Sequence, residues 1–350
     1  MSKKALLSQV LGTFYNFFFR RKIIIFDAPA AFHINHLLPV IYKLTADNQF
    51  KIIVVSPISN AGLATNIKFY ASVPLYVYKP LFITTEFSRK PFWLTCRSIY
   101  FGHGIGPKLN YQEGQSLLDF DYVYSPCLPI YNVQKKIINE NKLIKIGLPI
   151  VENAPKNKEE FLKFFNLSAT KMVIVYAPSW CNDSEKISDI EQILTYLGKQ
   201  KGVSIIISAH PLLLKPEKCD GKIFFENRPN NLQMNPANSP YTTLDLISLS
   251  EGLISDISSV LFEGMALNKI VFFDGNKEIY DYCEAQEVYN ELIDFCPIPD
   301  WNDSNNTFLV SVLCEDKNKV DRHNFINSYL FNVGSASTKL IQHIKEIIYK

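Results

Sequence analysis

The sequence is built from short apolar runs that alternate with stretches of helical periodicity. A strand of a parallel sheet is buried on both faces, so it reads as an unbroken apolar run. We therefore predict two α/β halves, each with a parallel sheet that helices cover on both faces. The runs lie at 22–29, 50–57, 81–85, 97–102, 121–126 and 143–149 in the first half, and at 171–180, 202–211, 221–227, 251–256 and 269–274 in the second.

The periodicity between these runs predicts helices at 33–46, 186–200, 257–268, 277–290 and 337–350. We divide the chain into an amphipathic helix at 1–22, a Rossmann-like domain at 23–150, a second Rossmann-like domain at 151–335 and a C-terminal helix at 336–350. Two doubly wound domains of this kind are expected to face a central cleft. Ligands of such sheets bind beyond the carboxyl ends of the strands.

The composition argues against two classes of protein. The formal net charge of the chain is +2, so nothing indicates binding to nucleic acid. The seven cysteines are scattered singly, without a C-x-x-C pair or a Cys/His cluster of zinc spacing. This pattern predicts reduced thiols in a cytosolic protein.

The first 22 residues have an apolar stripe between basic ends. The segment is too short and too interrupted to span a bilayer, and no small-residue cleavage site follows it. Its basic flanks suit an anionic membrane surface, whereas the alternative is a helix that docks on the protein's own core. The stripe consists of Leu6, Leu7, Val10, Leu11, Phe14, Phe17 and Phe18.

Polar residues end several of the predicted strands, two of them with a histidine. His103 lies in the glycine-rich stretch "FGHGIGPK" in the first half, and His210 ends "SIIISAH" in the second. The run "YAPSW" ends in Pro178 and Ser179. A single histidine at a strand end can have a purely structural role, but two at strand ends in opposite halves indicate a functional site. His33 and His36 follow the first strand and are further candidates to line the cleft.

The stretch "LISDISSVLFEG" at 253–264 changes from strand to helix. Asp256, Ser258 and Ser259 lie at the junction, where the N–H groups of a helix N-terminus bind anions. Glu263 lies one turn after Ser259, where it can accept hydrogen bonds from ribose hydroxyls. The alternative is a simple Ser/Asp helix cap with a solvated glutamate.

Taken together, these motifs resemble those of the CDP-glycerol:poly(glycerophosphate) glycerophosphotransferase family, the teichoic-acid-type polymerases and primases. The resemblance runs from about residue 100 to 285 and departs from the family pattern at Ile105, at Ser208, where a basic residue often precedes His-Pro, at Ile257 and at Glu263. The matching stretches are His103–Lys108, "GLPIVEN" at 147–153, "YAPSW" at 176–180, His210–Pro211, Asp256–Glu263 and "FFDGNKEIYDY" at 272–282.

The resemblance implies a GT-B fold and an inverting transfer of glycerol phosphate from CDP-glycerol to a hydroxyl of a lipid-linked or glycan acceptor, with release of CMP. In that scheme His103 is the base, and histidine suits this role because it titrates near neutral pH. His210 holds the pyrophosphate of the donor. Ser258 and Ser259 bind phosphate oxygens, Glu263 holds ribose and Ser179 contacts the donor. Gly104, Lys108, Pro211 and Asp256 are further substrate-binding positions.

The same resemblance implies no metal and no cofactor, because helix N–H groups and an imidazole stabilise the phosphates. The amphipathic N-terminus and a lipid-linked acceptor together predict a peripheral protein on the cytoplasmic face of a bacterial inner membrane. Two alternatives stay open. One is a GT-B glycosyltransferase that uses a CMP- or UDP-activated sugar such as Kdo for capsule or lipopolysaccharide. The other is an inactive homologue that scaffolds a surface-polymer complex.

Overall fold

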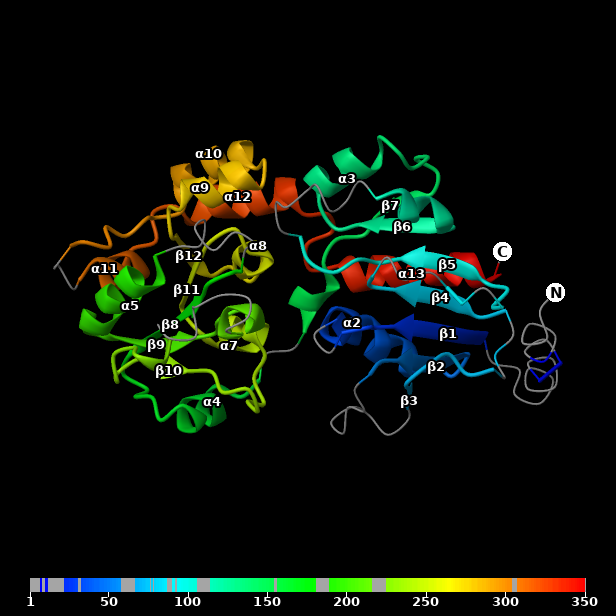
Figure 1. Ribbon diagram of the computed structural model, residues 1–350, viewed down its shortest axis with the longest axis horizontal. Coiled ribbons are helices and arrows are strands. Elements are labelled where there is room, and N and C mark those ends of the chain that lie inside the picture. Colours follow the sequence, from blue (N-terminus) through cyan, green and yellow to red (C-terminus); the bar gives the residue numbers. More distant parts are fainter. Residues whose placement is uncertain are drawn as a thin grey trace. The chain divides into compact units, whose positions relative to one another are not determined.

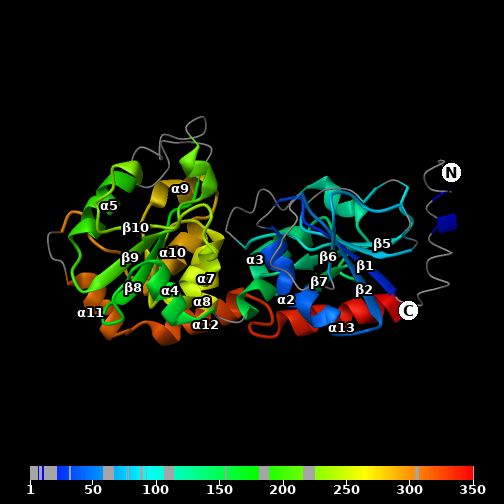
Figure 2. The same ribbon diagram turned by 90° about the horizontal axis from the view of Figure 1, so that it is seen from below.

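The computed structural model consists of two compact units (Figures 1 and 2). One unit holds the described residues up to Ile105, from 114 to Asn153 and from Tyr329 onward, and the other holds those from 156 to Ser328. The sequence analysis places the boundaries after residues 150 and 335. The structure describes residues 7, 10–11, 22–30, 33–57, 67–75, 77, 79–86, 90–91, 93–105, 114–153, 156–180, 189–215, 225–303 and 307–349.

The first unit contains a parallel sheet in the order β3-β2-β1-β4-β5-β6-β7. The order reverses between β1 and β4, as in a doubly wound fold. Its strands are β1 (Lys22–Asp27), β2 (Phe50–Val55), β3 (Lys68–Tyr70), β4 (Leu81–Thr84), β5 (Arg97–Tyr100), β6 (Tyr122–Ser125) and β7 (Leu143–Lys145). Its α-helices are α2 (His33–Thr45), α3 (Leu128–Gln134) and α13 (Ala336–Tyr349).

Both faces of this sheet are buried, which explains the unbroken apolar runs. Side chains alternate between the faces of a strand, so Ile24 and Phe26 of β1 join one core cluster and Ile23 and Ile25 join another. The first cluster also takes in residues of α2 and of α13. The predicted C-terminal helix therefore forms part of the core of the first unit.

Polar contacts anchor α13 to the same unit. The Tyr124 hydroxyl and His343 Nδ1 lie 2.9 Å apart, and the Arg97 guanidinium donates to the carbonyl oxygen of Ile347 at 2.6 Å. Gly147 has a φ of +93°, and a Cβ built there would lie 2.0 Å from the carbonyl oxygen of Phe331. Only glycine allows the backbone of the "GLP" turn and the chain that returns before α13 to pass this close.

The second unit repeats the plan with a parallel sheet in the order β10-β9-β8-β11-β12. The order reverses between β8 and β11. Its strands are β8 (Met172–Ala177), β9 (Val203–Ile207), β10 (Gln233–Met234), β11 (Gly252–Ser255) and β12 (Ile270–Phe273). Its α-helices are α4 (Lys158–Phe164), α5 (Ile190–Lys199), α7 (Thr243–Leu249), α8 (Ser259–Ala266), α9 (Lys277–Tyr282), α10 (Gln286–Phe295), α11 (Phe308–Cys314) and α12 (Lys319–Tyr329).

The expected α/β class with two Rossmann-like parallel sheets is confirmed, and two local predictions are wrong. The helix predicted at 277–290 is two helices, because Glu284 adopts a left-handed φ of +56° between α9 and α10. The strand predicted at 221–227 is helical at Phe225 and Glu226. The buried Phe225 side chain joins the core of this unit, so its apolar character reflects burial rather than pairing in the sheet.

Most of the amphipathic segment predicted at 1–22 lies outside the described residues. Leu7, Val10 and Leu11 are described, are helical, and are 40 to 47% exposed. Within the described part of the chain, no helix combines the length and the apolar character that crossing a membrane requires.

Candidate active site

Each sheet brings polar residues together at the point where its strand order reverses. In the first unit, the Thr84 hydroxyl at the end of β4 donates to Asp27 Oδ2 at the end of β1, at 3.0 Å. In the second unit, the Ser179 N–H after β8 donates to both carboxylate oxygens of Asp256 after β11, at 3.1 and 3.0 Å. These points are where doubly wound sheets bind ligands. In the second unit, Ser179 lies at this point, and the His210 backbone N–H donates to the Pro178 carbonyl oxygen at 3.2 Å.

His103 follows β5, in a turn where Gly102 and Gly104 both have positive φ angles, of +74° and +82°. Its Nδ1 atom lies 2.9 Å from the carbonyl oxygen of Thr85. A carbonyl oxygen only accepts, so Nδ1 carries the proton. The neutral ring therefore has its lone pair on Nε2, which is the arrangement that a general base requires.

Glu86, which directly follows Thr85, completes a cluster around this histidine. Its Oε1 atom lies 3.5 Å from His103 Nδ1 and 3.3 Å from His33 Nε2. The His33 and His103 rings pack with their centroids 4.2 Å apart. The carboxylate is placed to stabilise a positive charge on His103. The sequence analysis missed Glu86, because only the adjacency of β4 and β5 reveals that it lies beside His103.

His33 and His36, which the sequence predicts to line a cleft, lie at the start of α2. Burial, and then the charge on His103, lower the pKa of both rings to about 3. Both rings therefore stay neutral near pH 7. Gly104 lies in the described turn, whereas Lys108 lies outside the described residues.

Asp256, which follows β11, holds the turn that follows β8 in the second unit. Its side chain is 1% exposed and holds the Ser179 backbone, and its carbonyl oxygen accepts from the Tyr280 hydroxyl at 3.4 Å. Ser255 adds a second tie, with its hydroxyl donating to the Ala177 carbonyl oxygen at 2.7 Å. The carboxylate is thus engaged with the protein backbone, which makes Asp256 a positioning residue for the Pro178–Ser179 turn.

Two hydroxyl groups near Asp256 are buried without a hydrogen-bond partner among the residues that the structure describes. They are Ser179 Oγ and Tyr176 Oη. A buried hydroxyl without a hydrogen-bond partner lowers the stability of the folded protein by about 1–3 kcal/mol. A bound polar ligand recovers this free energy, so the hydroxyl of Ser179 is consistent with a contact to substrate.

Ser258 and Ser259 begin α8 and are both partly exposed. Ser258 is the N-cap, and its Oγ accepts from the Val260 N–H at 3.4 Å. Ser259 is the first helical residue. The positive end of the helix dipole favours an anion here. Gly264 keeps the helix close to β11, because a Cβ there would lie 2.7 Å from Leu253 Cδ2.

Glu263 lies on the same helix and is 4% exposed, not solvated as a simple capping glutamate would be. Burial raises the pKa of its carboxyl from 4.5 to about 7. No hydrogen bond reaches this side chain from the described part of the chain. A buried acceptor in this state is suited to hydroxyl groups of a ligand.

His210 follows β9 and caps the short 3-10 helix Pro211–Leu214. Its Nδ1 accepts from the Leu212 N–H at 3.2 Å, so the neutral ring carries its proton on Nε2. The ring is exposed and stacks on Trp180, with the centroids 6.3 Å apart. His210 therefore offers an N–H donor, which suits a phosphate oxygen.

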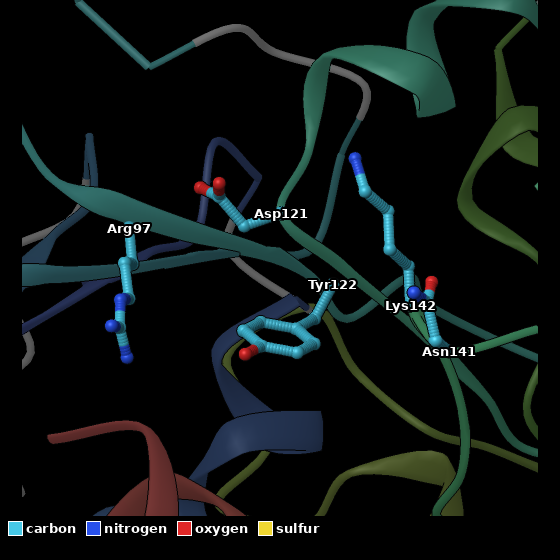
Figure 3. Close-up of a pocket in the computed structure, with 5 residues that line it drawn as sticks. All are labelled: Arg97, Asp121, Tyr122, Asn141 and Lys142. Atoms are coloured by element: carbon cyan, nitrogen blue, oxygen red, sulfur yellow. The ribbon is translucent and has the colours of Figure 1, made fainter. Parts of the chain in front are cut away.

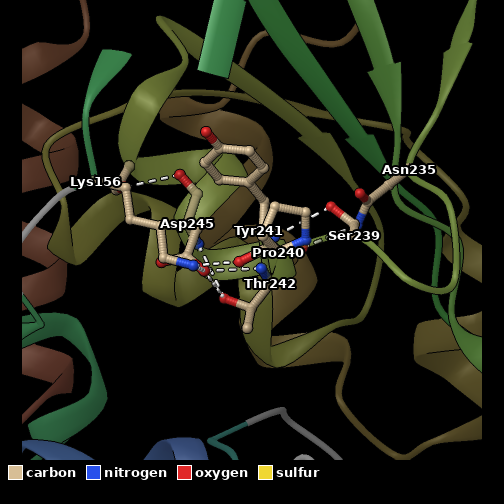
Figure 4. A network of polar contacts seen from close by, with 8 residues as sticks. Lys156, Asn235, Ser239, Pro240, Tyr241, Thr242 and Asp245 are labelled. Carbon is tan, nitrogen blue, oxygen red and sulfur yellow. Dashed lines mark hydrogen bonds and ion pairs between the residues drawn. The ribbon is translucent and has the colours of Figure 1, made fainter. Parts of the chain in front are cut away.

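Two other polar features serve structure. Figure 3 shows a small pocket at the amino ends of β5, β6 and β7, the opposite strand ends from His103. Both cationic side chains of this pocket donate hydrogen bonds to backbone carbonyl oxygens. Arg97 donates to Ile347, and Lys142 donates to Phe120 at 3.5 Å. Figure 4 shows Lys156 beside Asp245 at 3.1 Å, in a network with the capping box of α7. This network ties the segment before α4 to α7.

Comparison with known proteins decides the family. The family model described as CDP-Glycerol:Poly(glycerophosphate) glycerophosphotransferase matches residues 108–345. The chain belongs to this family. The match includes Ser179, His210 and the α8 junction of the second unit, but begins after His103.

Curated relatives of this glycerophosphotransferase family member are distant and longer than the match. A teichoic acid glycerol-phosphate primase of Bacillus subtilis is 27% identical over 174 residues, which cover 46% of this chain and 41% of the primase. A teichoic acid ribitol-phosphate primase of Bacillus spizizenii is 22% identical over 228 residues, which cover 59% of this chain and 56% of that protein. The chain thus spans about half the length of these relatives.

Solved structures agree with the fold. The wall teichoic acid polymerase TagF has a TM-score of 0.66 and 19% identity, over 94% of this chain and 89% of that one. A complex of UDP with MnaA of S. aureus has a TM-score of 0.59 and 12% identity, over 94% and 98% of the two chains. These likenesses support the GT-B class of fold that the family resemblance implies.

Proposed function

We propose that this protein is a transferase that moves glycerol phosphate from CDP-glycerol to a hydroxyl of a cell-surface polymer or lipid-linked acceptor, with release of CMP. Family membership supports the donor and the class of reaction. The observation that carries the proposal is the pair of histidines. His103 presents a lone pair on Nε2, as a base requires, and His210 presents an N–H, as an anion site requires.

The groups named here account for the proton, the bond formed and the bond broken in the transfer step. His103 Nε2 accepts the proton of the acceptor hydroxyl, and the acceptor oxygen bonds to the β-phosphorus of CDP-glycerol. The bond from this phosphorus to the oxygen that bridges it to CMP breaks, and CMP leaves with the electron pair. Glu86 stabilises the imidazolium that forms, since its Oε1 lies 3.5 Å from His103 Nδ1. Attack opposite the leaving group inverts the phosphorus centre.

The second unit is proposed to hold the donor. Ser258, Ser259 and the N-terminus of α8 receive phosphate oxygens, and the His210 Nε2–H stabilises the charge that develops on the leaving phosphate. Glu263 accepts hydrogen bonds from the ribose hydroxyls. These donors and acceptors supply the stabilisation without a metal or cofactor, so transfer is proposed to be metal-independent.

Attachment to an anionic membrane surface is a further part of the proposal. The described residues Leu7, Val10 and Leu11 are spaced for one helix face and are 40 to 47% exposed, which favours a membrane over the protein's own core as the partner of this face. Deletion of residues 1–20 is expected to release the protein from vesicles with anionic lipids. An unfolded truncated chain would support the core-docked alternative.

Calorimetric titration tests the donor assignment, with CDP-glycerol, CDP-ribitol, CMP-Kdo and UDP-sugars on the wild type and Ser259→Ala. We expect CDP-glycerol to bind most tightly. The variant should lose about tenfold in affinity, because it lacks one hydrogen bond to a charged group. Preference for CMP-Kdo or a UDP-sugar would make the protein a glycosyltransferase with the same fold. Absence of binding to any activated donor would support the scaffold alternative.

A further inference from the structure

Three side chains in the first unit converge from three different elements. His33 begins α2, Glu86 follows β4 and His103 follows β5. One ligand atom of each lies within 4.8 Å of the other two, with His33 Nε2 and His103 Nδ1 at 3.3 and 3.5 Å from Glu86 Oε1. The His33 side chain is 2% exposed, while those of Glu86 and His103 are each 34% exposed. The cluster is therefore built into the protein on one side and open on the other.

The spacing of these atoms fits a tetrahedral metal ion. Zinc binds imidazole nitrogen and carboxylate oxygen at about 2.0–2.2 Å, which in a tetrahedron separates neighbouring ligands by roughly 3.3 Å. Two of the three separations already have nearly this value. The set of two imidazoles and one carboxylate favours Zn²⁺ and its neighbours, such as Co²⁺, over Mg²⁺ and Ca²⁺, which prefer oxygen ligands.

We propose that His33, Glu86 and His103 form a binding site for one divalent ion of the Zn²⁺ type, and that occupation of this site switches transfer off. The inhibitory part rests on the proposed function, in which His103 is the base.

The inhibition follows from the two ring nitrogens of His103. A metal ion on Nδ1 takes the electron pair of that nitrogen and displaces the hydrogen bond to Thr85, which is 2.9 Å long without the ion. A neutral ring has one proton, so it must then lie on Nε2. Nε2 becomes a donor and can no longer accept the proton of the acceptor hydroxyl. The protein would thus respond to the supply of free transition metal.

Titration of the full-length protein with Co²⁺, followed by visible absorption, tests the site independently of transfer, with Zn²⁺ used to displace the Co²⁺. We expect one equivalent to bind with the intense d–d bands of four-coordinate cobalt. Glu86→Gln keeps the shape of a partly exposed side chain and should weaken binding at least tenfold, and His33→Gln should do the same. His323→Gln, at an exposed position of α12, is the matched control and should bind as the wild type does.

Binding that is unchanged in both Glu86→Gln and His33→Gln, or no binding of either ion at about 100 µM, would overturn the site. A transfer assay with CDP-glycerol separates the two proposals. Inhibition by one equivalent of Zn²⁺ that EDTA reverses supports both. Metal binding without any transfer activity in the apoprotein would leave the site standing and refute the proposed function. Transfer that bound Zn²⁺ does not slow would overturn the switch.

Discussion

His103 and His210 carry their ring protons on opposite nitrogens. The Thr85 carbonyl oxygen, 2.9 Å away, fixes the proton of His103 on Nδ1, whereas the Leu212 N–H, 3.2 Å away, fixes that of His210 on Nε2. One ring therefore presents a base and the other a donor. Backbone contacts within each unit thus set the tautomer of each ring.

His210→Ala is expected to weaken binding of CDP-glycerol about tenfold, because one hydrogen bond to a charged phosphate is lost. Binding of cytidine, which lacks phosphate, should not change. Calorimetry with the two ligands measures the difference, with His323→Ala as the control. Equal weakening for both ligands would mean that His210 supports the fold of the site rather than the pyrophosphate.

Asp256→Ala is expected to lower the free energy of unfolding by about 1–3 kcal/mol, because the buried Ser179 N–H loses its acceptor. CDP-glycerol binding should weaken as well, since the Pro178–Ser179 turn is no longer held. Urea unfolding and calorimetry measure the two effects. Asp281→Ala, on the exposed face of α9, is the control and should change neither by more than about 0.5 kcal/mol. Wild-type stability of the Asp256 variant would contradict the claim that this carboxylate holds the Pro178–Ser179 turn.

Glu263 makes a stability prediction that depends on pH. The pKa of its carboxyl is about 7 in the folded protein and 4.5 ordinarily, so between these values the folded state holds a proton that the unfolded state has released. Wild-type stability therefore falls as pH rises through this window. Glu263→Gln removes the effect, and should stabilise the protein at pH 8 by up to about 3 kcal/mol and hardly at pH 4.5. A gain that is the same at both values would exclude the raised pKa as its cause.

Gly147→Ala is expected to cost more than about 3 kcal/mol, because its Cβ would meet the Phe331 carbonyl oxygen at 2.0 Å and because φ is +93°. Gly334→Ala is a matched control. Its φ is +74°, with no atom within 4 Å of the Cβ, so it should cost only about 1 kcal/mol of backbone strain. Thermal unfolding of the two variants measures the difference. Similar costs would mean that the close approach to Phe331 relaxes easily.

Long apolar runs such as β1 and β8 could be predicted from the sequence, because both of their faces are buried. The short strands β3 and β10 were not predicted, because Lys68–Tyr70 and Gln233–Met234 do not stand out as unbroken apolar runs. Glu284 breaks a predicted helix through a backbone angle that its side chain does not require.

The same distinction applies to the site. Ser258, Ser259 and Glu263 lie on one local strand-to-helix junction, which the sequence reveals. Glu86 and His33 meet His103 only because β1, β4 and β5 are neighbours in the sheet. Nothing in the spacing of these residues along the chain indicates that order.

Single-turnover transfer of glycerol phosphate from labelled CDP-glycerol to a lipid-linked acceptor, with His103→Gln beside the wild type and EDTA present, tests the central claim most directly. We predict that the wild type releases CMP in step with product, and that the variant is slower by about 10²–10⁴, the usual worth of a general base, with unchanged affinity for CDP-glycerol. Transfer by the variant at the wild-type rate, or no transfer by the wild type from this donor, would contradict the account.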